Sequence, residues 1–418
     1  MSPQQLPYGA YRFPDGTLIS IRKSVGKSLR ARRYADGYSR RLFPDKKHEY
    51  ITGPGFSRKS PTEAQIAFEH AADGHITGMR WEATGSEAQV AQRVNRVIEL
   101  EFESDDVRFY AQLHLPNIPG PHPAVVLLHG SGKDAATQFY YNADFYAAHG
   151  IATLVYDKRG TGLSNGKFTF DFQQLARDAL AAVKLLRDHP EIDAERIALS
   201  GYSQGGWVAP LAASMDAGIR FVTVNYGMIE SPEVEARLET REEVLRRGVS
   251  PNALDVLDDL TAVSVKLVHT DFQEGWDTLQ TLRETHKKAP WRKRISGMTI
   301  DMFMRLPLFA IKLAGPFFAL RGLDWYYSSD AVLDQLNIPM LWLLAENDSG
   351  APNEQTIPKL EAYIASGKPF TLHVFPNTDH GILQFEEVEG GRAITGYAPG
   401  YFQTEIGWAK AQFGLETS

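Results

Sequence analysis

From residue 123 onward the sequence alternates short runs of β-branched and other apolar residues with stretches of helical periodicity. This alternation is typical of a mostly parallel β-sheet with crossover helices, and nearly continuous apolar runs indicate strands that are covered on both faces. The runs lie at residues 124–128, 151–156, 196–199, 221–224, 340–344 and 370–375. We therefore predict an α/β fold, with a mostly parallel central sheet and helices on both of its faces.

The segments between these runs predict the connecting elements. Apolar residues recur at helical spacing in 175–186, and this helix is expected to end before Pro190. Similar helices are predicted at 135–148 and 204–215. Upstream, residues 97–103 and 107–115 flank Ser104-Asp105-Asp106, which predicts an antiparallel hairpin leading into the sheet.

Two segments differ from this pattern. Residues 1–95 are rich in Gly, Pro, Tyr and Arg, carry turn signals and show no internal repeat, which predicts a small β-rich accessory domain. Residues 230–334 interrupt the strand rhythm. Within them, Ser231-Pro232 and Ser250-Pro251 each place a capping hydroxyl before a proline at a first helical position. We expect a helical cap over the carboxyl edge of the sheet, where open α/β sheets bind ligands, and a sheet domain formed by 96–229 and 335–418.

Composition excludes several classes of protein. The chain of 418 residues has a formal net charge of −7 with acidic and basic residues mixed, unlike the basic stripe of a nucleic-acid-binding protein. The local basic clusters at 30–33 (RARR) and 292–294 (RKR) are expected to be solvated surface. The absence of cysteine excludes disulfides, thiolate metal sites and a cysteine nucleophile.

The N-terminal stretch lacks the basic start and apolar run of a secretory signal, so a cytoplasmic protein is expected. The most apolar segment, 302–320, is interrupted by charges and prolines, whereas a membrane-spanning helix needs about 20 apolar residues with few or no charges. We interpret it as a lid or a buried helix pair and expect no membrane association. No phosphate loop, zinc spacing or His-Glu-x-x-His motif is found, so neither a cofactor nor a metal is expected.

One serine directly follows the run at 196–199. Gly201 and Gly205 flank Ser203 in the pattern Gly-x-Ser-x-Gly, and a helix is expected after it. In such a nucleophile elbow a strained turn exposes the serine hydroxyl, and the flanking residues must be small because strand and helix approach closely. The pattern also occurs by chance, when the serine is only a polar turn residue, so Ser203 needs catalytic partners elsewhere in the chain.

A serine hydroxyl is a poor nucleophile unless a base removes its proton, and in this arrangement the order along the chain is Ser, acid, His. The histidines after Ser203 are His269 and His286 in the helical insertion, His373 within a predicted strand, and His380 on the loop after that strand. Only His380 lies at the expected sheet edge, so we predict that it is the base.

The orienting acid is chosen in the same way. Asp348 lies on the loop after the run at 340–344, which is the same sheet edge as Ser203 and His380. Glu346 is the competing acid, and Asp348 is favoured. Alone, Asp348 would be an ordinary turn aspartate and His380 an ordinary loop histidine.

An acyl-transfer site also needs backbone N–H groups to stabilise the negative oxygen that develops on the attacked carbonyl. One donor is expected to be the Gln204 N–H, at the helix N-terminus after the nucleophile. The other is expected from the glycine-rich loop at 129–132 (HGSG), and we assign it to the Ser131 N–H.

Together these motifs resemble the α/β-hydrolase superfamily, over about residues 97–413. The resemblance rests on five ordered motifs: HGSG at 129–132, YDKRGTGLS at 156–164, GYSQGG at 201–206, END at 346–348 and DHG at 379–381. Within the superfamily the sequence is most similar to bacterial esterases related to the dienelactone hydrolase and acylaminoacyl-peptidase branches. It departs from them in its short N-terminal unit without propeller repeats, its large helical insertion, and a serine where dienelactone hydrolases have cysteine.

The resemblance implies a serine hydrolase in which Ser203 attacks an acyl carbonyl, His380 is general base and then acid, and Asp348 orients it. It also implies that His129, Gly130, Asp157 and Arg159 support the site without being catalytic. We expect a carboxylesterase acting on a small-molecule ester or acyl substrate. The same chemistry would serve an amidase, peptidase or thioesterase, and a non-catalytic binding protein on this fold is a remote alternative.

The predicted cap suggests that the acyl group is partly apolar. Its aromatic residues could line a substrate site or form the cap's own core; they are Phe303, Phe309, Phe317, Phe318, Trp325, Tyr326 and Tyr327.

Overall fold

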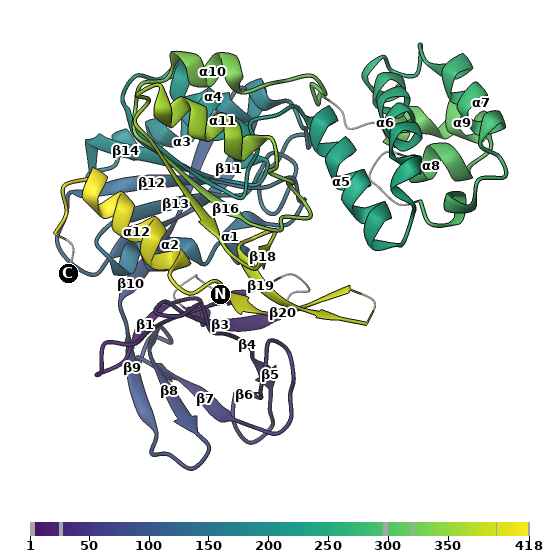
Figure 1. Cartoon of the computed structure of the whole chain (residues 1–418). Helices are drawn as coiled ribbons and strands as arrows, with labels where there is room; N and C mark the ends of the chain where they lie inside the picture. The colour runs from purple at the N-terminus through teal and green to yellow at the C-terminus, as the bar shows by residue number, and fades with distance from the viewer. Residues whose placement is uncertain (1–4, 25–27, 296–299, 319–321, 390, 417–418) are drawn as a thin grey trace.

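An eight-stranded sheet forms the centre of the computed structural model, which describes residues 5–24, 28–295, 300–318, 322–389 and 391–416 (Figure 1). The strands lie in the order β10-β11-β13-β12-β14-β15-β16-β17. Strands β12 to β17 are all parallel, and β11 is antiparallel to both of its neighbours. The bounds are β10 (Asn95–Ser104), β11 (Val107–Pro116), β12 (His122–Leu128), β13 (Ala152–Tyr156), β14 (Ile192–Tyr202), β15 (Ile219–Asn225), β16 (Met340–Ala345) and β17 (Phe370–Phe375). The predicted α/β sheet and its leading hairpin are confirmed.

Helices cover both faces of this sheet, as predicted. One face packs against α3 (Phe172–Arg187), α4 (Gly205–Met215), α10 (Asp330–Gln335) and α11 (Thr356–Ala365). The other face packs against α2 (Asn142–Ala148) and α12 (Tyr401–Gln412). The prediction that every strand is covered on both faces is wrong for β17, where Thr371 and His373 are exposed, because β17 is the edge strand.

The single helix predicted at 135–148 is instead two pieces, α1 (Ala136–Phe139) and α2. The chain leaves the helical conformation at Tyr140, whose φ and ψ are −76° and 86°. The Tyr140 hydroxyl accepts a hydrogen bond of 3.0 Å from the Gly130 N–H. This contact between residues that are distant in the sequence gives a physical reason for the interruption of the helix at Tyr140. The local periodicity of residues 135–148 could not reveal such a contact.

The N-terminal part of the chain forms a separate sheet of nine antiparallel strands, in the order β4-β3-β2-β1-β9-β8-β7-β6-β5. The bounds are β1 (Gly9–Arg12), β2 (Leu18–Lys23), β3 (Leu29–Arg33), β4 (Ser39–Arg41), β5 (Phe43–Pro44), β6 (Tyr50–Thr52), β7 (Ala64–His70), β8 (Ile76–Ala83) and β9 (Gln89–Arg93). The predicted β-rich N-terminal domain is confirmed as an antiparallel sheet, whereas the domain boundaries at 95/96, 229/230 and 334/335 stay predictions.

One expectation for this sheet is wrong. Within the basic cluster at 30–33, Arg30 and Arg32 are buried, not solvated. Both lie on β3 and both project into packed surroundings: the Arg30 guanidinium lies 3.5 Å from the centre of the Phe56 ring, and that of Arg32 lies 4.3 Å from the centre of the Tyr141 ring. Aromatic faces can hold a guanidinium at such positions, and a charge count along the sequence does not detect them.

A buried ion pair joins the two sheets. Asp144 of α2 accepts two hydrogen bonds from the Arg22 guanidinium of β2, of 2.9 and 3.0 Å, and one of 2.9 Å from the Ser20 hydroxyl. It also contacts His114 Nδ1 at 3.0 Å and the Asn95 amide at 3.2 Å. Burial alone would raise the pKa of Asp144, but the Arg22 charge and these hydrogen bonds lower it. The carboxylate is therefore ionised and fixes the N-terminal sheet to the central domain.

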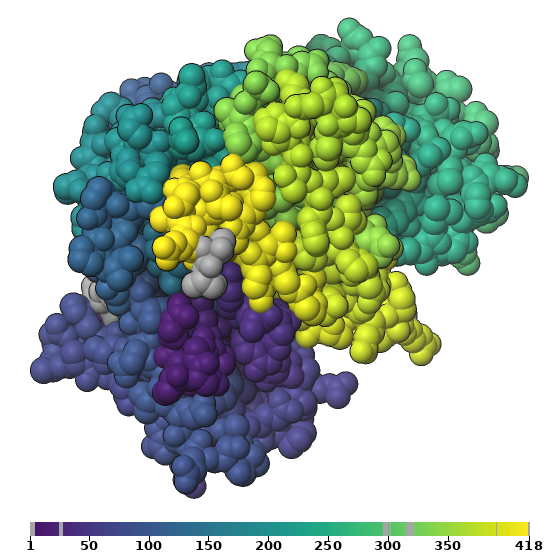
Figure 2. Space-filling model, turned by 60° about the vertical axis from the view of Figure 1, so that its left-hand side comes forward, coloured from purple at the N-terminus to yellow at the C-terminus, as the bar shows by residue number. Residues whose placement is uncertain are grey.

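A second contact between the two domains involves an unpredicted hairpin after His380. A small sheet contains β18 (Thr378–Asp379), β19 (Leu383–Val388) and β20 (Gly391–Tyr397). The Tyr397 N–H donates a hydrogen bond of 3.0 Å to the Gly37 carbonyl. Figure 2 shows this C-terminal region, in yellow, lying directly on the purple N-terminal domain.

The insertion at 230–334 is mainly helical, as predicted. It contains α5 (Pro232–Arg246), α6 (Leu254–His269), α7 (Trp276–Thr285), α8 (Ile300–Arg305), α9 (Leu308–Phe318) and the short 3₁₀ turns Pro251–Ala253 and Pro290–Lys293, before α10. Ser231 caps α5 by accepting a hydrogen bond from the Val234 N–H, whereas Ser250 precedes a 3₁₀ turn and makes no side-chain capping bond. Figure 1 shows α6 to α9 beyond α5, on the side away from the sheet.

The apolar segment 302–320 forms α8 and α9, and residues 319 and 320 lie outside the described part. It is not a buried pair, because Phe309 and Leu313 of α9 are each 75% exposed, whereas Phe303 packs in the core shared by α6 to α9. Within the described residues, no helix combines the length and apolar character needed to cross a membrane.

We predict that Asp144→Asn strongly destabilises the protein. The substitution leaves the Arg22 charge buried without its partner, and breaking a buried pair in this way costs about 3–5 kcal/mol. The lowered pKa means that the stabilisation is present above the ordinary value of 3.8 and is lost on acidification. Urea unfolding measures the effect.

Asp36→Asn is the matched control, because Asp36 pairs with Arg33 in the same sheet but both side chains are more than one third exposed. A surface pair of this kind contributes at most about 1 kcal/mol. Equal unfolding midpoints for the two variants would contradict the role given to Asp144.

Candidate active site

Ser203 lies at the turn between β14 and α4, as predicted for a nucleophile elbow. Its φ is +53°, a left-handed conformation that is costly for a residue with a side chain. A Cβ on Gly201 would collide with the Gly205 carbonyl, and a Cβ on Gly205 would collide with the Leu128 carbonyl. The two glycines thus permit the close approach of strand and helix that places the Ser203 hydroxyl at the carboxyl edge of the sheet.

The structure brings Ser203, His380 and Asp348 together in one hydrogen-bonded chain. His380 Nε2 lies 3.1 Å from the Ser203 Oγ, and His380 Nδ1 lies 2.8 Å from the Asp348 Oδ1. Both distances allow hydrogen bonding and proton transfer. The competing acid Glu346 does not touch His380, since its carboxylate accepts hydrogen bonds from the Asn347 side chain and the Asn377 N–H.

Backbone and side-chain contacts hold the acid and the base in place. The Asp348 Oδ1 also accepts the N–H groups of Gly350 and Ala351, at 3.0 and 2.7 Å. Asp379 accepts hydrogen bonds from the Ser349 N–H and hydroxyl and from the His380 N–H, all of 2.7 Å. The loop that carries the acid is therefore tied to the loop that carries the base.

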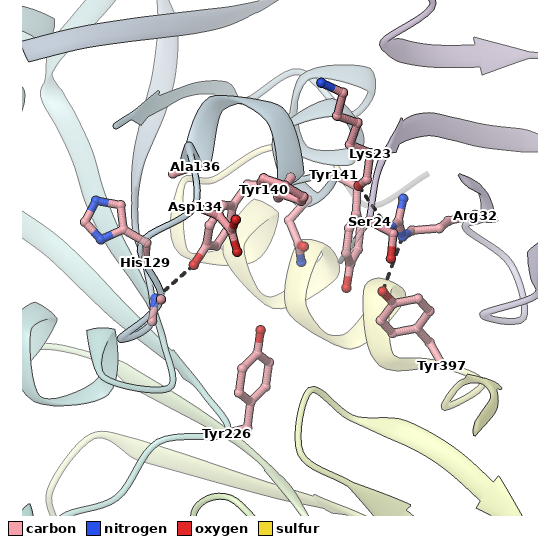
Figure 3. A pocket seen from close by; sticks show the side chains of 14 residues that line it. Lys23, Ser24, Arg32, His129, Asp134, Ala136, Tyr140, Tyr141, Tyr226 and Tyr397 are labelled. Carbon is pink, nitrogen blue, oxygen red and sulfur yellow. Dashed lines mark hydrogen bonds between the residues drawn. The ribbon is translucent and has the colours of Figure 1, made fainter. Parts of the chain in front are cut away.

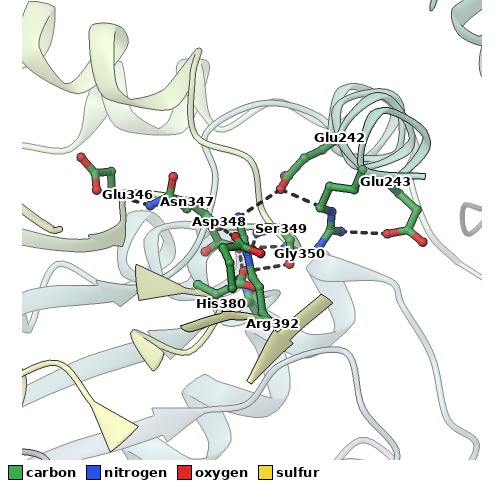
Figure 4. A network of polar contacts seen from close by, with 12 residues as sticks. Glu242, Glu243, Glu346, Asn347, Asp348, Ser349, Gly350, His380 and Arg392 are labelled. Atoms are coloured by element: carbon green, nitrogen blue, oxygen red, sulfur yellow. Dashed lines mark hydrogen bonds and ion pairs between the residues drawn. The ribbon is translucent and has the colours of Figure 1, made fainter. Parts of the chain in front are cut away.

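Arg392 of β20 reinforces this connection, and Figure 4 shows it between the acid loop and α5. It donates hydrogen bonds of 2.8 Å to the Asp379 carboxylate and to the Asn347 carbonyl, and it lies 3.9 Å from Glu242 of α5. Sequence reasoning missed Arg392, because nothing local connects a residue on the later hairpin with the loops at 348 and 380.

The predicted oxyanion donors are both available. Among the described residues, no hydrogen bond engages the N–H groups of Gln204 or Ser131, whereas the Gly130 N–H is donated to Tyr140. Gly130 lies against the nucleophile, since a Cβ on it would be 3.8 Å from the Ser203 Oγ. The glycine-rich loop thus lies beside Ser203.

Lys158 is a further residue of the site that the sequence did not reveal. Its Nζ donates a hydrogen bond of 2.6 Å to the Gly130 carbonyl, lies 3.5 Å from the Gln204 side-chain oxygen, and lies 4.8 Å from the centre of the Phe168 ring. Burial lowers the pKa of Lys158 to about 7. Its place directly after the apolar run at 151–156, within the motif at 156–164, was the available signal.

The residues predicted to be supporting take structural positions. Asp157 accepts hydrogen bonds of 3.0 Å from the Thr137 N–H and hydroxyl and from the Leu163 N–H, and Arg159 forms a two-point ion pair with Asp178 of α3. His129 packs edge-on against Tyr156, and burial followed by the Lys158 charge lowers its pKa well below the ordinary value, which keeps it neutral. None of these three contacts the Ser-His-Asp chain by a hydrogen bond.

A group of acidic side chains on α5 faces the site and was also missed. Burial, followed by the charge of Glu239, raises the pKa of Glu235 to about 8, and burial also raises the pKa values of Glu239 and Glu242. The spacing of these three residues places them on one face of the helix. Within the described part of the insertion, α5 contributes most of the side chains beside Asp348, and Leu254 of α6 lies at the same pocket.

The sequence leaves open whether the cap's aromatic residues line a substrate site or form the cap's own core, and the structure describes the side chains of five of these seven residues. Phe303 and Trp325 are buried in packing among the helices of the insertion, Tyr327 packs on Phe172, and Phe309 and Tyr326 are exposed. The side chains of Phe317 and Phe318 lie outside the described part. The cap-core interpretation of Phe303 and Trp325 is therefore the one that the structure supports.

With the fold and the site described, the chain can be compared with known proteins. A strand-turn-helix serine on a mostly parallel sheet is the architecture of α/β-hydrolases. Residues 125–389 match the Alpha/beta hydrolase family, and the chain belongs to this family. Across the described residues, no group of three or more histidine or acidic side chains could hold a metal ion.

Individual relatives match over shorter stretches. The thiohydrolase aneE of Aspergillus aculeatus is 31% identical over 157 residues, which is 35% of this chain and 49% of that protein. The esterase FrsA of Vibrio vulnificus is 29% identical over 231 residues, which is 54% of this chain and 49% of that protein. The chain thus spans about half the length of these relatives. The crystal structure of the α/β-hydrolase GrgF from Penicillium sp. sh18 is 18% identical, covers 77% of this chain and all of that one, and gives a TM-score of 0.44.

We predict that His380 titrates above the ordinary histidine value of 6.5. Burial lowers the pKa of His380, but the Asp348 charge and hydrogen bond outweigh burial and raise it. Asp348→Asn removes that charge, so the pKa should fall. The measurement is an NMR titration of the protein with ¹³C-labelled histidine rings.

Glu346→Gln is the matched control, because it removes a neighbouring carboxylate that does not touch His380. An unchanged titration in Asp348→Asn, or a fall of the same size in Glu346→Gln, would show that Asp348 is not the partner of His380.

Proposed function

We propose that this protein is a serine hydrolase that cleaves carboxylic esters through an acyl-enzyme intermediate. The Ser203 oxygen attacks the ester carbonyl carbon as His380 Nε2 takes the hydroxyl proton. The resulting tetrahedral oxyanion is stabilised by the N–H groups of Gln204 and Ser131. His380 then donates the proton to the leaving alcohol, and water attacks the acyl-enzyme by the same route to release the acid.

A single observation carries this proposal: the unbroken chain from Asp348 through His380 to Ser203, with contacts of 2.8 and 3.1 Å, at a strained turn. Asp348 fixes the imidazole with Nδ1 protonated, so Nε2 faces the hydroxyl as the acceptor. Neither the Ser203 hydroxyl nor His380 stabilises the negative charge that develops on the carbonyl oxygen. The N–H groups of Gln204 and Ser131, which make no hydrogen bond among the described residues, are proposed to do so.

A thioester is the second candidate bond. The same acyl-enzyme chemistry serves it, with a thiol as leaving group, and the similarity to a protein named a thiohydrolase favours this alternative. Amide or peptide cleavage uses the same residues and is the third possibility. A small-molecule substrate is part of the proposal in each case.

The helical insertion is proposed as a cap whose contact with the site is made by α5. The pocket beside the acid loop is lined by Leu238, Glu242 and Leu245 of α5 and by Asn347 and Asp348. A helix in this position limits access to His380 from one side, so we infer that it contributes to the choice of substrate.

We expect wild-type protein to hydrolyse p-nitrophenyl esters, and Ser203→Ala to lose that activity. Removing a triad nucleophile costs roughly three to six orders of magnitude in kcat. The assay compares esters of increasing acyl length, the matching thioesters and aminoacyl p-nitroanilides, and the preferred series identifies the bond.

Ser214→Ala is the control for the mutation itself, because Ser214 lies on α4, the helix that follows Ser203, and among the described residues its hydroxyl bonds to the Leu211 carbonyl. It should retain wild-type rates. Well-folded wild-type protein that turns over none of the three series, yet binds acyl compounds, would instead support a non-catalytic binding protein.

Lys158→Met should lower kcat more than it changes KM. The substitution removes the hydrogen bond that orients the Gly130 carbonyl, which belongs to the same peptide unit as the Ser131 N–H. Loss of an oxyanion-hole donor costs roughly 10²–10³ in kcat, and misorientation should cost less. Steady-state kinetics measure both parameters, and a rise in KM alone would assign Lys158 to substrate binding.

A further inference from the structure

We propose that the N-terminal sheet completes the substrate site, with Arg32 binding a carboxylate group of the substrate in a pocket beside Ser203. This proposal names the class of substrate for the proposed hydrolase. It rests on that function, because the molecule bound by Arg32 is hydrolysed only if Ser203 is catalytic. It assigns a role to the N-terminal domain, which the catalytic chemistry alone does not require.

The pocket has a volume of about 270 Å³ and runs between the two domains (Figure 3). At one end it is lined by Gly130, which touches Ser203, and by Tyr226, whose ring centre lies 4.9 Å from that of His380. At the other end it is lined by Arg32 of β3 and Tyr397 of β20. The pocket therefore extends from Arg32 to residues that neighbour Ser203 and His380, and we infer that a bound molecule can reach from Arg32 to the Ser203 hydroxyl.

The walls between these ends are mostly aromatic. Besides Tyr226 and Tyr397, the lining includes Phe139, Tyr140 and Tyr141. Such walls bind the apolar or aromatic body of a small molecule, and polar groups at defined positions fix its orientation. The charged group at the far end is then the main source of specificity.

Arg32 is buried, with 2% of its surface exposed, and has no carboxylate partner among the described residues. Its Nε donates to the Tyr397 hydroxyl at 3.3 Å, and its two terminal nitrogens reach only the Lys23 and Arg30 carbonyls, at 3.4 and 3.5 Å. These contacts are long, so the planar donor pair of the guanidinium is weakly satisfied.

A buried charge without a counter-charge is costly, and an anion in the pocket would remove that cost. The neighbouring strand shows the usual solution, because Arg22 is paired with the buried Asp144. The Tyr397 hydroxyl responds to the same unbalanced charge: burial acts to raise its pKa, but the charge and hydrogen bond of Arg32 outweigh burial and lower it. This corner of the pocket thus stabilises negative charge.

The other charges near the pocket favour a singly charged anion. Lys23 also lines it, but its Nζ is engaged by the Gln138 side chain at 2.7 Å. Asp134 is the acid among the lining residues; its side chain is exposed, and Figure 3 shows it on the side of His129, away from Arg32. One available guanidinium matches a carboxylate, which it can bind through two parallel hydrogen bonds, better than a phosphate dianion.

The first test measures binding without catalysis. Calorimetry with Ser203→Ala protein compares 3-phenylpropionate with 3-phenylpropanamide, which share a body and differ in charge. The carboxylate should bind roughly 10- to 100-fold more tightly, the factor expected of a charge-assisted pair of hydrogen bonds. Equal affinities would overturn the proposal, and so would a preference that persists in the double variant Ser203→Ala/Arg32→Gln.

Arg30→Gln is the matched control. Arg30 lies on the same strand and is buried without a carboxylate partner, but it bonds to the Phe56 carbonyl at 2.7 Å and does not line the pocket. The Arg30→Gln variant should keep the full preference for the carboxylate over the amide. If Arg30→Gln lost this preference, the effect of Arg32→Gln would be attributed to a disturbed fold of the N-terminal sheet. Arg32→Lys, which keeps the charge but not the planar donor pair, is the second variant if Arg32→Gln does not fold, and it should retain only part of the preference.

The second test uses the active enzyme, with mono-p-nitrophenyl adipate and its methyl ester as the charged and neutral substrates. The ratio of their kcat/KM values should favour the charged substrate in wild type and fall about 10-fold or more in Arg32→Gln. If the carboxylate binds preferentially in the first test but no ester is hydrolysed, the carboxylate site is supported and the hydrolase function is rejected. Hydrolysis with no preference in either test would reject the carboxylate site alone.

Discussion

The strained turn at Ser203 is the constraint on which the rest of the site depends. A positive φ at a serine persists only where the surroundings hold it, and here the Ser203 N–H donates to the Asn225 carbonyl at 2.9 Å while its own carbonyl accepts the Gly206 N–H at 2.7 Å. Below the turn, Glu405 of α12 accepts hydrogen bonds from Tyr202 and from the Asn225 side chain, at 2.8 and 3.0 Å. Glu405 thus holds the end of β14, which precedes Ser203, and the end of β15, which lies beside β14.

Around this fixed point the site is assembled from elements far apart in the chain. The parallel strands β14, β16 and β17 end at one edge, which brings the serine, acid and base loops together. The β19–β20 hairpin then connects two regions: Arg392 holds the acid and base loops, and Tyr397 contacts the N-terminal sheet. The Asp144 ion pair joins the same sheet to α2, and Arg32 of that sheet lines the pocket.

Much of the fold and the core of the site could be predicted from sequence. Parallel strands that are buried on both faces leave a continuous apolar signal, and the motif at 201–205 and the loop of Asp348 come after such runs, whereas His380 comes after the partly exposed edge strand β17. What could not be predicted depends on contacts between distant residues. The helix break at Tyr140 follows its bond to Gly130, and the burial of Arg32 depends on packing against Tyr141. Lys158 looked like an ordinary charged residue because its partner, the Gly130 carbonyl, lies on another loop.

Every proposal above depends on Ser203 being the nucleophile, activated by its neighbours. The most direct measurement is covalent trapping: incubation with a fluorophosphonate, then intact-mass analysis and peptide mapping, with Ser203→Ala and His380→Ala treated in parallel. We predict one adduct per chain on Ser203, none in Ser203→Ala and strongly slowed labelling in His380→Ala. Labelling at another residue, or no labelling of folded wild-type protein that still hydrolyses esters, would contradict it.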